Sequence, residues 1–538
     1  MKITYLVDGV KKEAIESNAD FDLVVENKEN RSLVTLKAKK DLDLVLAEDK
    51  LNVTCNSTDL YFLNGYQSWT DTKEFSLKQK LRNIKKSPKL ITKMFALDKY
   101  GDSEFYEYTP KKMHGYDIFY SKGKSESFLY SLNFNVAYLI IELHKDDKSI
   151  HLLSDINGIS LKANEEITIF DYKYFSNYEE GLESFKKDFP SLNKEKIFGY
   201  TSWYNYYQNI NEEIILKDLD ALDSRFNVFQ IDDGYETFVG DWLDIDEKKF
   251  PNGLEKIVEK IHSKGYKAGI WLAPFVAETK SKLFEEHRDW FLRDKEGNPA
   301  LAGGNWSKFY ALDYTKEEVK DYIRKCLEYY MNIGFDFFKL DFLYAAALYV
   351  KNGKSRCQAQ KEAYEFLRNI LKDKIILGCG ANIINSYKTF DYLRIGPDVS
   401  LKFDDVFYMR LFHRERISTK VTIQNTIFRH IFDGHLFGND PDVFLLRDEN
   451  IDLTDEQKKA LTIINALMGS VFMTSDNIAT YNEDKKSILD KAFNLFYKAE
   501  VTSVKTNGKN LIYIDYVISN ENKRLTYNYK KGVLVDYE

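Results

Sequence analysis

Residues 335–342 read FDFFKLDF, and this stretch decides the fold. A short, almost continuous apolar run after a helix-ending Gly334 is typical of a strand buried on both faces in a parallel sheet. Lys339 and Asp341 are two residues apart, so their side chains leave the strand on the same side. Ionisable groups in such a place are costly unless they are paired or in use. Parallel α/β barrels keep their chemistry at this end of the strands, although Asp341 could instead cap the next helix or pair with Lys339.

The composition indicates a soluble globular protein with several domains. The chain has 538 residues, of which 44% are hydrophobic and 30% are charged, and its formal net charge is −7. It has no basic stretch suited to nucleic acid or to a membrane surface, and no apolar run long enough to cross a bilayer. The four cysteines are far apart and fit neither a disulfide framework nor a zinc site. Without a secretory signal at the N-terminus, these features predict a cytoplasmic protein; a homo-oligomer is left open.

Periodicity divides the chain into three regions. Residues 1–185 show alternating apolar and polar positions, as in the strand predicted at 132–140, which favours an N-terminal antiparallel β-sandwich. Residues 186–482 alternate strand and helix patterns, which predicts a catalytic (β/α)8 TIM barrel and places the protein in the α/β class. Residues 483–538 predict a small C-terminal β domain after one helical stretch.

Eight strand candidates occupy the barrel region, and residues 309–313 are a possible ninth. Polar groups end nearly all of them. A single Asp at a strand end is usually a helix cap, but a ring of such groups with a Lys and an Arg is typical of a polyol site, where Trp203 and Trp271 offer flat faces to a sugar. The candidates are 198–204, 228–233, 267–275, 335–342, 375–380, 392–398, 435–442 and 470–476. The strand-end groups are Asp232, Asp233, Lys339, Asp341, Cys379, Arg394, Asp398, Asp440, Asp442 and Asp476.

Glycoside hydrolysis needs two carboxyl groups in different protonation states. Asp341 is predicted as the nucleophile, because Lys339 projects from the same side and a nearby cation favours the ionised form. Asp398 is predicted as the acid/base, because it follows a proline in a sharp turn where partial burial can raise its pKa. A plain turn aspartate is the alternative for Asp398. Asp232 and Asp233 are adjacent, so at least one of them is expected to bind hydroxyl groups.

The order of ten short motifs resembles that of glycoside hydrolase family 36, the bacterial α-galactosidases, and especially a short, thermophile-type branch. The likeness covers nearly the whole chain. The motifs are NGYQSWT at 64–70, SWYNYY at 202–207, VFQIDDGYE at 228–236, GDWL at 240–243, GIWLAPF at 269–275, YALDYT at 310–315, FFKLDFLYA at 337–345, ILGCG at 376–380, RIGPD at 394–398 and NDPD at 439–442.

The resemblance implies a retaining, exo-acting α-galactosidase that hydrolyses terminal α-D-galactosyl residues of oligosaccharides, with no metal or other cofactor. It gives the same roles to Asp341 and Asp398. Trp69, which is otherwise an ordinary core residue of the sandwich, is expected to reach across to the barrel. The implied ligands are Asp232 and Asp233 for the 4- and 6-hydroxyl groups, Cys379 with Arg394 near the 2-hydroxyl, and Trp69, Trp203, Trp271 and Lys339 in the same subsite.

Three departures from the family pattern lie near the aglycone side. Tyr66 stands where tryptophan is common, Gly438 precedes the NDPD motif, and residues 400–405 read SLKFDD where a small residue and aromatic residues are usual. The exact sugar therefore stays open. The alternatives are an α-N-acetylgalactosaminidase, a galactosyl transferase of the same family, an α-glucosidase, a non-catalytic carbohydrate-binding protein and a metal enzyme of the enolase kind. Galactose is preferred because Cys379 and Arg394 fill the space that an acetamido group needs.

Overall fold

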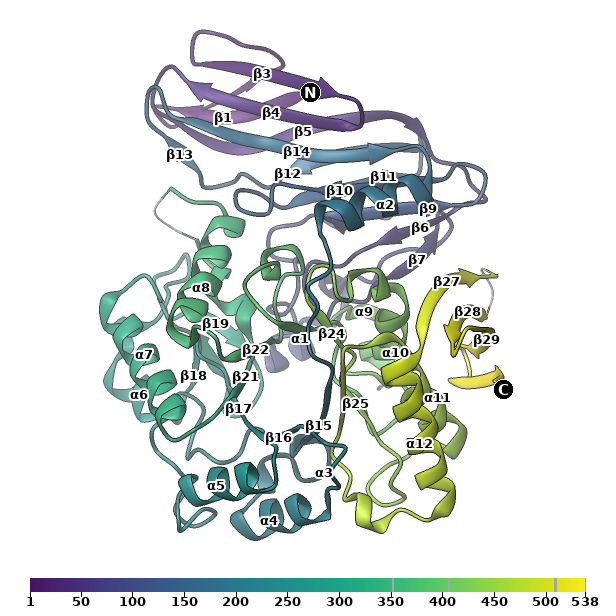
Figure 1. The fold of residues 1–538 in the computed structure, drawn as a ribbon. Coiled ribbons are helices and arrows are strands. Elements are labelled where there is room, and N and C mark those ends of the chain that lie inside the picture. Colours follow the sequence, from purple (N-terminus) through teal and green to yellow (C-terminus); the bar gives the residue numbers. More distant parts are fainter. Residues whose placement is uncertain (351–352, 405–406, 508–509, 538) are drawn as a thin grey trace.

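The chain folds into three parts that contact one another. The computed structural model describes residues 1–350, 353–404, 407–507 and 510–537. Figure 1 shows an N-terminal β-sandwich above a barrel, with a small C-terminal sheet beside the last helices of the barrel. Within the described ranges, no helix is both long and apolar enough to span a bilayer.

The N-terminal part is a sandwich of two antiparallel sheets whose facing apolar side chains form its core. One sheet has the order β2, β1, β5, β12, β11, β8, with β13 beside β5, and the other has the order β3, β4, β14, β10, β9, β6, β7. The bounds are β1 Lys2–Val7, β2 Val10–Ala14, β3 Phe21–Lys28, β4 Arg31–Ala38, β5 Leu42–Thr54, β6 Leu60–Leu63, β7 Lys73–Ser76, β8 Lys112–Tyr116, β9 Ile118–Lys122, β10 Ser127–Ser131, β11 Leu139–His144, β12 Ser149–Ser154, β13 Ser160–Leu161 and β14 Glu166–Phe175.

The strand predicted at 132–140 was wrong for most of its length, because β11 begins only at Leu139. Two of the apolar residues before it, Phe134 and Tyr138, face the barrel instead of a neighbouring strand. The Phe134 ring packs edge-on against Tyr387 at 5.6 Å, and the Phe134 carbonyl accepts a hydrogen bond from Asn385 Nδ2 at 2.9 Å. An alternating pattern can thus arise from a loop that packs against another domain.

The predicted TIM barrel is confirmed, and all of its strands are parallel. Their order is β24, β23, β22, β21, β17, β16, β15, β26, β25. Each of the eight predicted strands overlaps one observed strand. The bounds are β15 Ile197–Thr201, β16 Val228–Ile231, β17 Lys267–Leu272, β21 Phe337–Leu340, β22 Ile375–Gly378, β23 Tyr392–Arg394, β24 Gly438–Asp440, β25 Val443–Phe444 and β26 Val471–Thr474.

The seventh barrel strand is split, and this split closes the sheet. Its first part, β24, pairs with β23, and its second part, β25, pairs with β26. Pro441 and Asp442 lie between the two parts, and Asp442 has a φ of 73°. Across the same seam, the Ser470 N–H donates to the Asn439 carbonyl at 2.9 Å. The two ends of the sheet are therefore joined through one interrupted strand.

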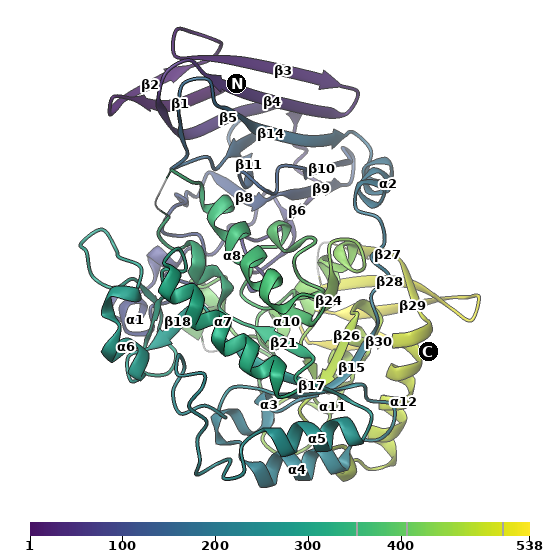
Figure 2. The same ribbon diagram turned by 60° about the vertical axis from the view of Figure 1, so that its left-hand side comes forward.

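Helices surround the barrel and link it to its neighbours (Figures 1 and 2). One of them, α11, has Thr454 as its N-cap and a complete capping box with Gln457. The bounds are α1 Lys89–Phe95, α2 Tyr178–Asp188, α3 Trp203–Tyr206, α4 Glu212–Ala221, α5 Glu255–Ser263, α6 Lys282–Glu286, α7 Glu317–Asn332, α8 Arg356–Leu371, α9 Phe407–Phe412, α10 Thr419–Phe428, α11 Asp455–Met468 and α12 Glu483–Lys498.

The possible ninth strand belongs to a separate small sheet. β20 (Phe309–Ala311) pairs with β18 (Val276–Glu278) and β19 (Leu301–Gly303) in antiparallel fashion, outside the barrel. The turn between β19 and β20 carries Trp306, whose position in the site is described below. The barrel thus keeps its eight strand positions.

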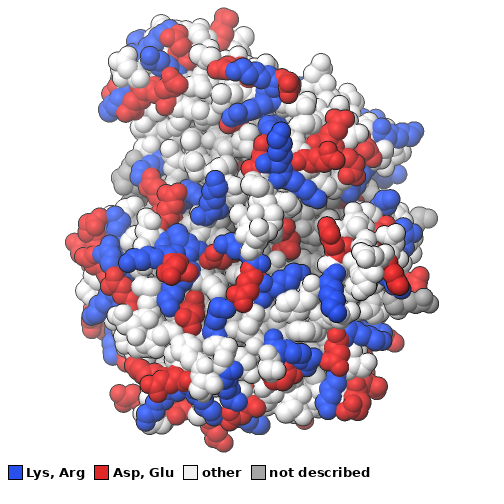
Figure 3. Space-filling model, viewed as in Figure 1, with Lys and Arg blue, Asp and Glu red and all other residues white. Residues whose placement is uncertain are grey.

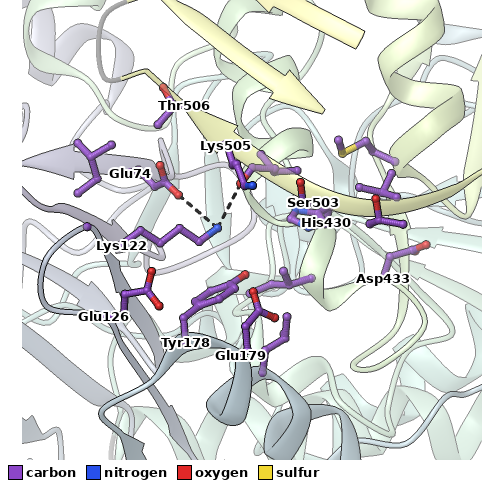
Figure 4. Close-up of a pocket in the computed structure, with 18 of the residues that line it drawn as sticks. Glu74, Lys122, Glu126, Tyr178, Glu179, His430, Asp433, Ser503, Lys505 and Thr506 are labelled. Carbon is purple, nitrogen blue, oxygen red and sulfur yellow. Dashed lines mark hydrogen bonds and ion pairs between the residues drawn. The ribbon is translucent and has the colours of Figure 1, made fainter. Parts of the chain in front are cut away.

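The C-terminal sheet is antiparallel, with β27 (Glu500–Thr506), β28 (Leu511–Ile518), β29 (Glu521–Asn528) and β30 (Val533–Asp536) in that order. A cavity of about 1090 Å³ separates its outer strand β27 from the sandwich (Figure 4). Lys122 crosses this cavity: its Nζ donates to the Val504 carbonyl at 3.2 Å and lies 3.9 Å from Glu74 Oε1. The sandwich therefore contacts the C-terminal sheet directly.

The surface carries both signs of charge, closely mixed. Figure 3 shows blue and red side chains interspersed over the sandwich, the barrel and the C-terminal sheet on this face. Ion pairs on the surface join many of these side chains, such as Arg31 with Asp171 at 2.7 Å. Such exposed pairs contribute about 0–1 kcal/mol each, so the fold depends mainly on its buried core.

Candidate active site

Asp341 lies at the end of β21, where two N–H groups hold its carboxyl group. Trp271, at the end of the neighbouring β17, donates its Nε1–H to Oδ2 at 3.0 Å, and the Phe342 N–H donates to Oδ1 at 2.7 Å. The residue is only 8% exposed. Burial raises the pKa of Asp341, and the charge of Lys339 and the Trp271 bond lower it without cancelling the effect of burial. Asp341 is thus a buried carboxyl group with directional donors.

Lys339 forms its ion pair with Asp232 and not with Asp341. Its Nζ lies 2.9 Å from Asp232 Oδ2, which also accepts from Gln230 Nε2 at 2.6 Å and from Thr201 Oγ1 at 3.1 Å. Burial by itself lowers the pKa of Lys339. The charges of Asp232 and Asp341 raise this pKa by more, so the net shift is upward and the ammonium group stays charged. Lys339, which lies on β21, therefore holds the carboxylate that follows β16.

The neighbouring carboxylate, Asp233, points to a different set of partners. It accepts a hydrogen bond from Gln208 Nε2 at 3.1 Å and from Trp306 Nε1 at 2.9 Å. Burial raises the pKa of Asp233, bonds from Glu236, Gln208 and Trp306 lower it, and the charge of Asp232 raises it. The two adjacent aspartates are both buried, and each has its own donors.

Asp398 stands at the open side of the site. Its side chain is 32% exposed, and Arg394, at the end of β23, donates Nη1–H to its Oδ1 at 3.0 Å. The same guanidinium meets Asp440 through Nε at 2.9 Å and Asp442 through Nη2 at 2.8 Å. The charge of Asp398 also raises the pKa of Asp341.

Trp69 reaches the strand ends of the barrel from the sandwich. Its Nε1–H donates to Cys379 Sγ at 3.4 Å, and its ring packs edge-on against Phe342 at 5.3 Å and against Tyr344 at 5.8 Å. Burial, together with the charge of Asp341, raises the pKa of the Cys379 thiol. Trp69 and Cys379, far apart in the sequence, therefore lie together over β21 and β22.

Trp203 lies on the side of Asp398. It opens α3, and its ring packs edge-on against Tyr207 at 5.1 Å. Burial raises the pKa of Tyr207, Arg447 lowers it and the charge of Asp398 raises it, which places Tyr207 close to Asp398. Tyr207 is 39% exposed, so the rim of the site is open at this point.

Several residues that lie in the site were not predicted from the sequence. Trp306 donates to Asp233, and its ring packs against Phe342 at 5.2 Å and Trp271 at 6.1 Å. A signal for it was present, because Trp306 is flanked by small and polar residues in GGNWS just as Trp69 is in NGYQSWT. Gln208 and Glu236, the other two neighbours of Asp233, gave no such signal.

The departures from the family pattern have local explanations. Tyr66 is buried, and its ring packs edge-on against Phe105, Tyr116 and Tyr138. At Gly438 a Cβ atom would lie 2.5 Å from the Tyr392 ring, so a larger residue does not fit there. In the segment 400–405, the Ser400 N–H donates to Thr419 Oγ1 at 3.0 Å, and Asp405 lies outside the described residues.

Polar groups on the barrel hold the sandwich loop that carries Trp69. Arg429, at the C-terminal end of α10, donates to Asn64 Oδ1 at 3.0 Å, to the Ser68 carbonyl at 2.5 Å and to the Gln67 carbonyl at 3.2 Å. It also donates to the carbonyl of Ile395, the residue after Arg394, at 2.7 Å. One buried side chain thus fixes the loop and the end of β23 together.

The site has two carboxyl groups in unlike surroundings, Asp341 and Asp398, and a second pair, Asp232 and Asp233, of which Lys339 holds the first. With the tryptophans around them, these groups are typical of the barrel proteins of the glycoside hydrolase class. Residues 185–372 match the model of the Melibiase family. The chain is 26% identical over 223 residues to alpha-galactosidase 1 of Pediococcus pentosaceus, which is 35% of this chain and 29% of that protein. The matched stretches span less than a third of the first curated relatives' own length.

Solved structures match over nearly the whole chain. The alpha-galactosidase TtGalA of Thermus thermophilus, in complex with p-nitrophenyl alpha-D-galactopyranoside, superposes with a TM-score of 0.72 at 25% identity, covering 97% of this chain and 98% of that one. The GH36 alpha-galactosidase AgaA of Geobacillus stearothermophilus shares the fold, with a TM-score of 0.62 at 12% identity over 94% of this chain and 72% of that one. The chain is thus similar to the alpha-galactosidases of family GH36, as the order of its motifs predicted.

Proposed function

We propose that the protein is a retaining exo-α-galactosidase that hydrolyses terminal α-D-galactosyl residues of oligosaccharides by double displacement. The observation that carries the proposal is the pair Asp341 and Asp398, which follow β21 and β23, two parallel barrel strands with only β22 between them. One is buried and held by N–H donors, and the other is partly open to solvent. Support comes from the relatives named as alpha-galactosidases and from the galactoside bound in one of them.

In the first step Asp341 attacks the anomeric carbon while Asp398 gives its proton to the glycosidic oxygen, and the bond between that carbon and oxygen breaks. The N–H groups of Trp271 and Phe342 orient the Asp341 carboxylate, so that an oxygen lone pair remains free for attack. The partial exposure of Asp398 suits a group that must meet a leaving group on the solvent side.

In the second step the ionised Asp398 takes a proton from water, and the water oxygen attacks the anomeric carbon. The bond from this carbon to Asp341 breaks, and galactose leaves with its original anomeric configuration. Retaining enzymes place their two carboxyl groups about 5–5.5 Å apart, whereas inverting enzymes leave room for a water molecule between them. We therefore expect the shorter separation between Asp341 and Asp398 in a complex with substrate.

Recognition of the sugar follows from the same set of contacts. Asp232 and Asp233 carry acceptor oxygens and face different donors, which suits the binding of two hydroxyl groups, those on carbons 4 and 6. Cys379 and Arg394 are proposed to lie beside the 2-hydroxyl. Because Trp69 covers the Cys379 thiol, an acetamido group on carbon 2 has little room, and galactose is favoured over N-acetylgalactosamine.

A panel of aryl α-glycosides tests this proposal. The galactoside, the N-acetylgalactosaminide and the glucoside are incubated with the enzyme, and the first anomer formed is followed by NMR. We expect the galactoside to react fastest and α-galactose to appear first. A β-anomer as first product would contradict retention, and faster release from the N-acetylgalactosaminide would contradict the assigned sugar. Adding a second sugar as acceptor measures transfer against hydrolysis.

We also propose a reducing, cytoplasmic location. The four cysteines, Cys55, Cys326, Cys357 and Cys379, are buried and unpaired. Thiol titration of freshly isolated, denatured protein should give four reactive groups per chain. Fewer would indicate an oxidising compartment.

A further inference from the structure

Asp442 is a buried carboxylate that the steps above do not use. Its Oδ2 accepts from the Val399 N–H at 2.7 Å and from the Tyr204 hydroxyl at 2.5 Å, and its Oδ1 lies 2.8 Å from Arg394 Nη2. The side chain is shielded from solvent. Because these partners follow two other barrel strands, β15 and β23, Asp442 joins three strand ends at one point.

The backbone at Asp442 is itself unusual. The residue lies in the gap between β24 and β25 and has a φ of 73°, a region that non-glycine residues seldom adopt. Its N–H donates to Asp440 Oδ1 at 2.8 Å, and Asp440 Oδ2 accepts from Arg394 Nε at 2.9 Å. Strained residues of this kind persist only where their surroundings fix them, and they gather at functional sites.

Two partners of Asp442 also hold Asp398. Val399 directly follows Asp398, so the bond to the Val399 N–H fixes the peptide after the acid/base residue. Arg394 donates to Asp398 Oδ1 at 3.0 Å while its other nitrogens meet Asp440 and Asp442. Asp442 therefore restrains Asp398 through the main chain and through the shared guanidinium.

The charges around this guanidinium are unbalanced, because one Arg394 faces the carboxyl groups of Asp398, Asp440 and Asp442. Burial raises the pKa of Asp442 to about 7; the charges of Asp398 and Asp440 add to the rise, and Arg394 and Tyr204 oppose it. The other titratable groups that Asp398 influences are Tyr204, Tyr207, Asp341 and Cys379.

We propose that Asp442 is a positioning residue for general acid catalysis: it fixes the peptide between Asp398 and Val399 and shares Arg394 with Asp398, so that the Asp398 carboxyl group faces the glycosidic oxygen. The proposal rests on the function proposed above.

The substitution Asp442→Asn removes the charge but keeps an oxygen for the Val399 N–H. We compare kcat/KM for p-nitrophenyl and for phenyl α-galactoside, because a misplaced acid matters most when the leaving group is poor. The expected loss is about a hundredfold or more for the phenyl substrate and less than about tenfold for the p-nitrophenyl one. Equal losses on both substrates, or no loss, would overturn the proposal.

Asp391→Asn is the matched control. Asp391 precedes β23 at its other end and, like Asp442, joins a strand to cations, here Lys194 and Arg368, both at 2.6 Å. This variant should have a lower midpoint of thermal unfolding. The ratio of its kcat/KM values for the two substrates should be unchanged. If the ratio changes as it does in Asp442→Asn, the effect is a general loss of packing and the proposal fails.

Two further variants keep the result interpretable. Tyr204→Phe removes one donor to Asp442 and should change the ratio in the same direction, which tests the proposal even if Asp442→Asn does not fold. An unchanged ratio in Tyr204→Phe would contradict it. Among the variants, kcat/KM of Asp398→Ala should depend most strongly on the leaving group. If it does not, the proposed function is wrong. If only the Asp442 and Tyr204 variants lack the effect, the positioning role alone fails.

Discussion

Asp341 sits where its own charge is unfavourable. Burial raises the pKa of its carboxyl group, and the cation on the same strand, Lys339, is engaged by Asp232. Lys339 therefore offers Asp341 a nearby positive charge without neutralising it in a direct pair. A carboxylate kept reactive in this way lowers the stability of the folded chain, and active sites often carry such a cost.

Replacement of Asp341 with Ala should remove activity and leave the fold intact. Because no group in the proposed mechanism replaces the nucleophile, we expect kcat on an aryl α-galactoside to fall by more than about a thousandfold. The thermal unfolding midpoint should stay the same or rise, since a buried charge is removed. Near-full activity in Asp341→Ala would refute the assigned role, and Asp391→Asn serves as the active, structurally weakened control.

Asp117 gives a pH prediction that is independent of catalysis. It is buried in the sandwich with a φ of 63°, and its Oδ1 accepts from the Leu139 N–H at 2.9 Å. Burial raises the pKa of Asp117 from 3.8 to about 7, the Leu139 bond lowers it, and the charge of Asp155 raises it. The folded chain thus binds this proton more tightly than the unfolded chain. Its contribution to stability is present below about pH 4 and is lost as the pH rises to about 7.

We therefore expect Asp117→Asn to be more stable than the parent at pH 8 by up to a few kcal/mol, because one pKa unit corresponds to about 1.4 kcal/mol. The difference should shrink toward zero at pH 4. Asn keeps the acceptor for Leu139 and tolerates the left-handed backbone. Urea unfolding of both proteins at the two pH values measures the effect. A difference that does not change with pH would show that Asp117 is not the titrating group.

Among the elements, the loop 64–72 of the sandwich depends on α10 of the barrel. Arg429 is buried, and its partners in the described structure are carbonyl and amide oxygens of the loop and of β23. Burial and the charge of Arg414 lower the pKa of Arg429 to about 9, while Asp71 raises it. The loop carries Trp69, so α10 controls a part of the site that it does not touch.

Arg429→Met should weaken both stability and turnover. The substitution leaves several buried oxygens unpaired, at about 1–3 kcal/mol for each unsatisfied group, and frees Trp69 to move. We expect kcat/KM to fall at least tenfold and the fluorescence of the protein to change. Lys361→Met is the control, because Lys361 is also buried against Asn385, Tyr387 and Thr389 but only within the barrel. Equal effects on kcat/KM in the two variants would contradict a specific role of Arg429.

The barrel strands could be predicted from sequence because each is a short apolar run that ends in polar groups, and that pattern reflects burial alone. The loop at 132–138 could not, since its alternation comes from packing against the barrel. The partner of Lys339 could not either: spacing placed Lys339 and Asp341 on one side, but Asp232, on a different strand, holds the lysine at 2.9 Å. Trp306 was missed because its role depends on where a small separate sheet folds.

In the whole molecule, the sandwich and the barrel share one apolar core. Phe62, Tyr66 and Tyr116 of the sandwich belong to the same buried cluster as the barrel strands. Polar contacts cross the same boundary, such as Asn382 Nδ2 to the Tyr66 carbonyl at 2.7 Å and Asn385 Nδ2 to the Phe134 carbonyl at 2.9 Å. Exposing this boundary would leave buried polar groups without partners on both sides.

We expect the sandwich and the barrel to unfold together. Calorimetry and tryptophan fluorescence should report one transition with the same midpoint, because unfolding of either part would expose the apolar cluster that the two parts share. Arg429→Met should lower that single midpoint. Two separated transitions, one of which leaves activity unchanged, would show that the parts are independent.

The origin of Trp69 limits how this enzyme can be rebuilt. The tryptophan that covers Cys379 belongs to the first part of the chain, and the thiol belongs to the second. A chimera that takes its barrel from one parent and its sandwich from another would combine a Trp69 and a Cys379 that did not evolve together. Laboratory recombination should therefore exchange residues 64–72 and the segment around Arg429 as one unit, wherever the crossover point is chosen.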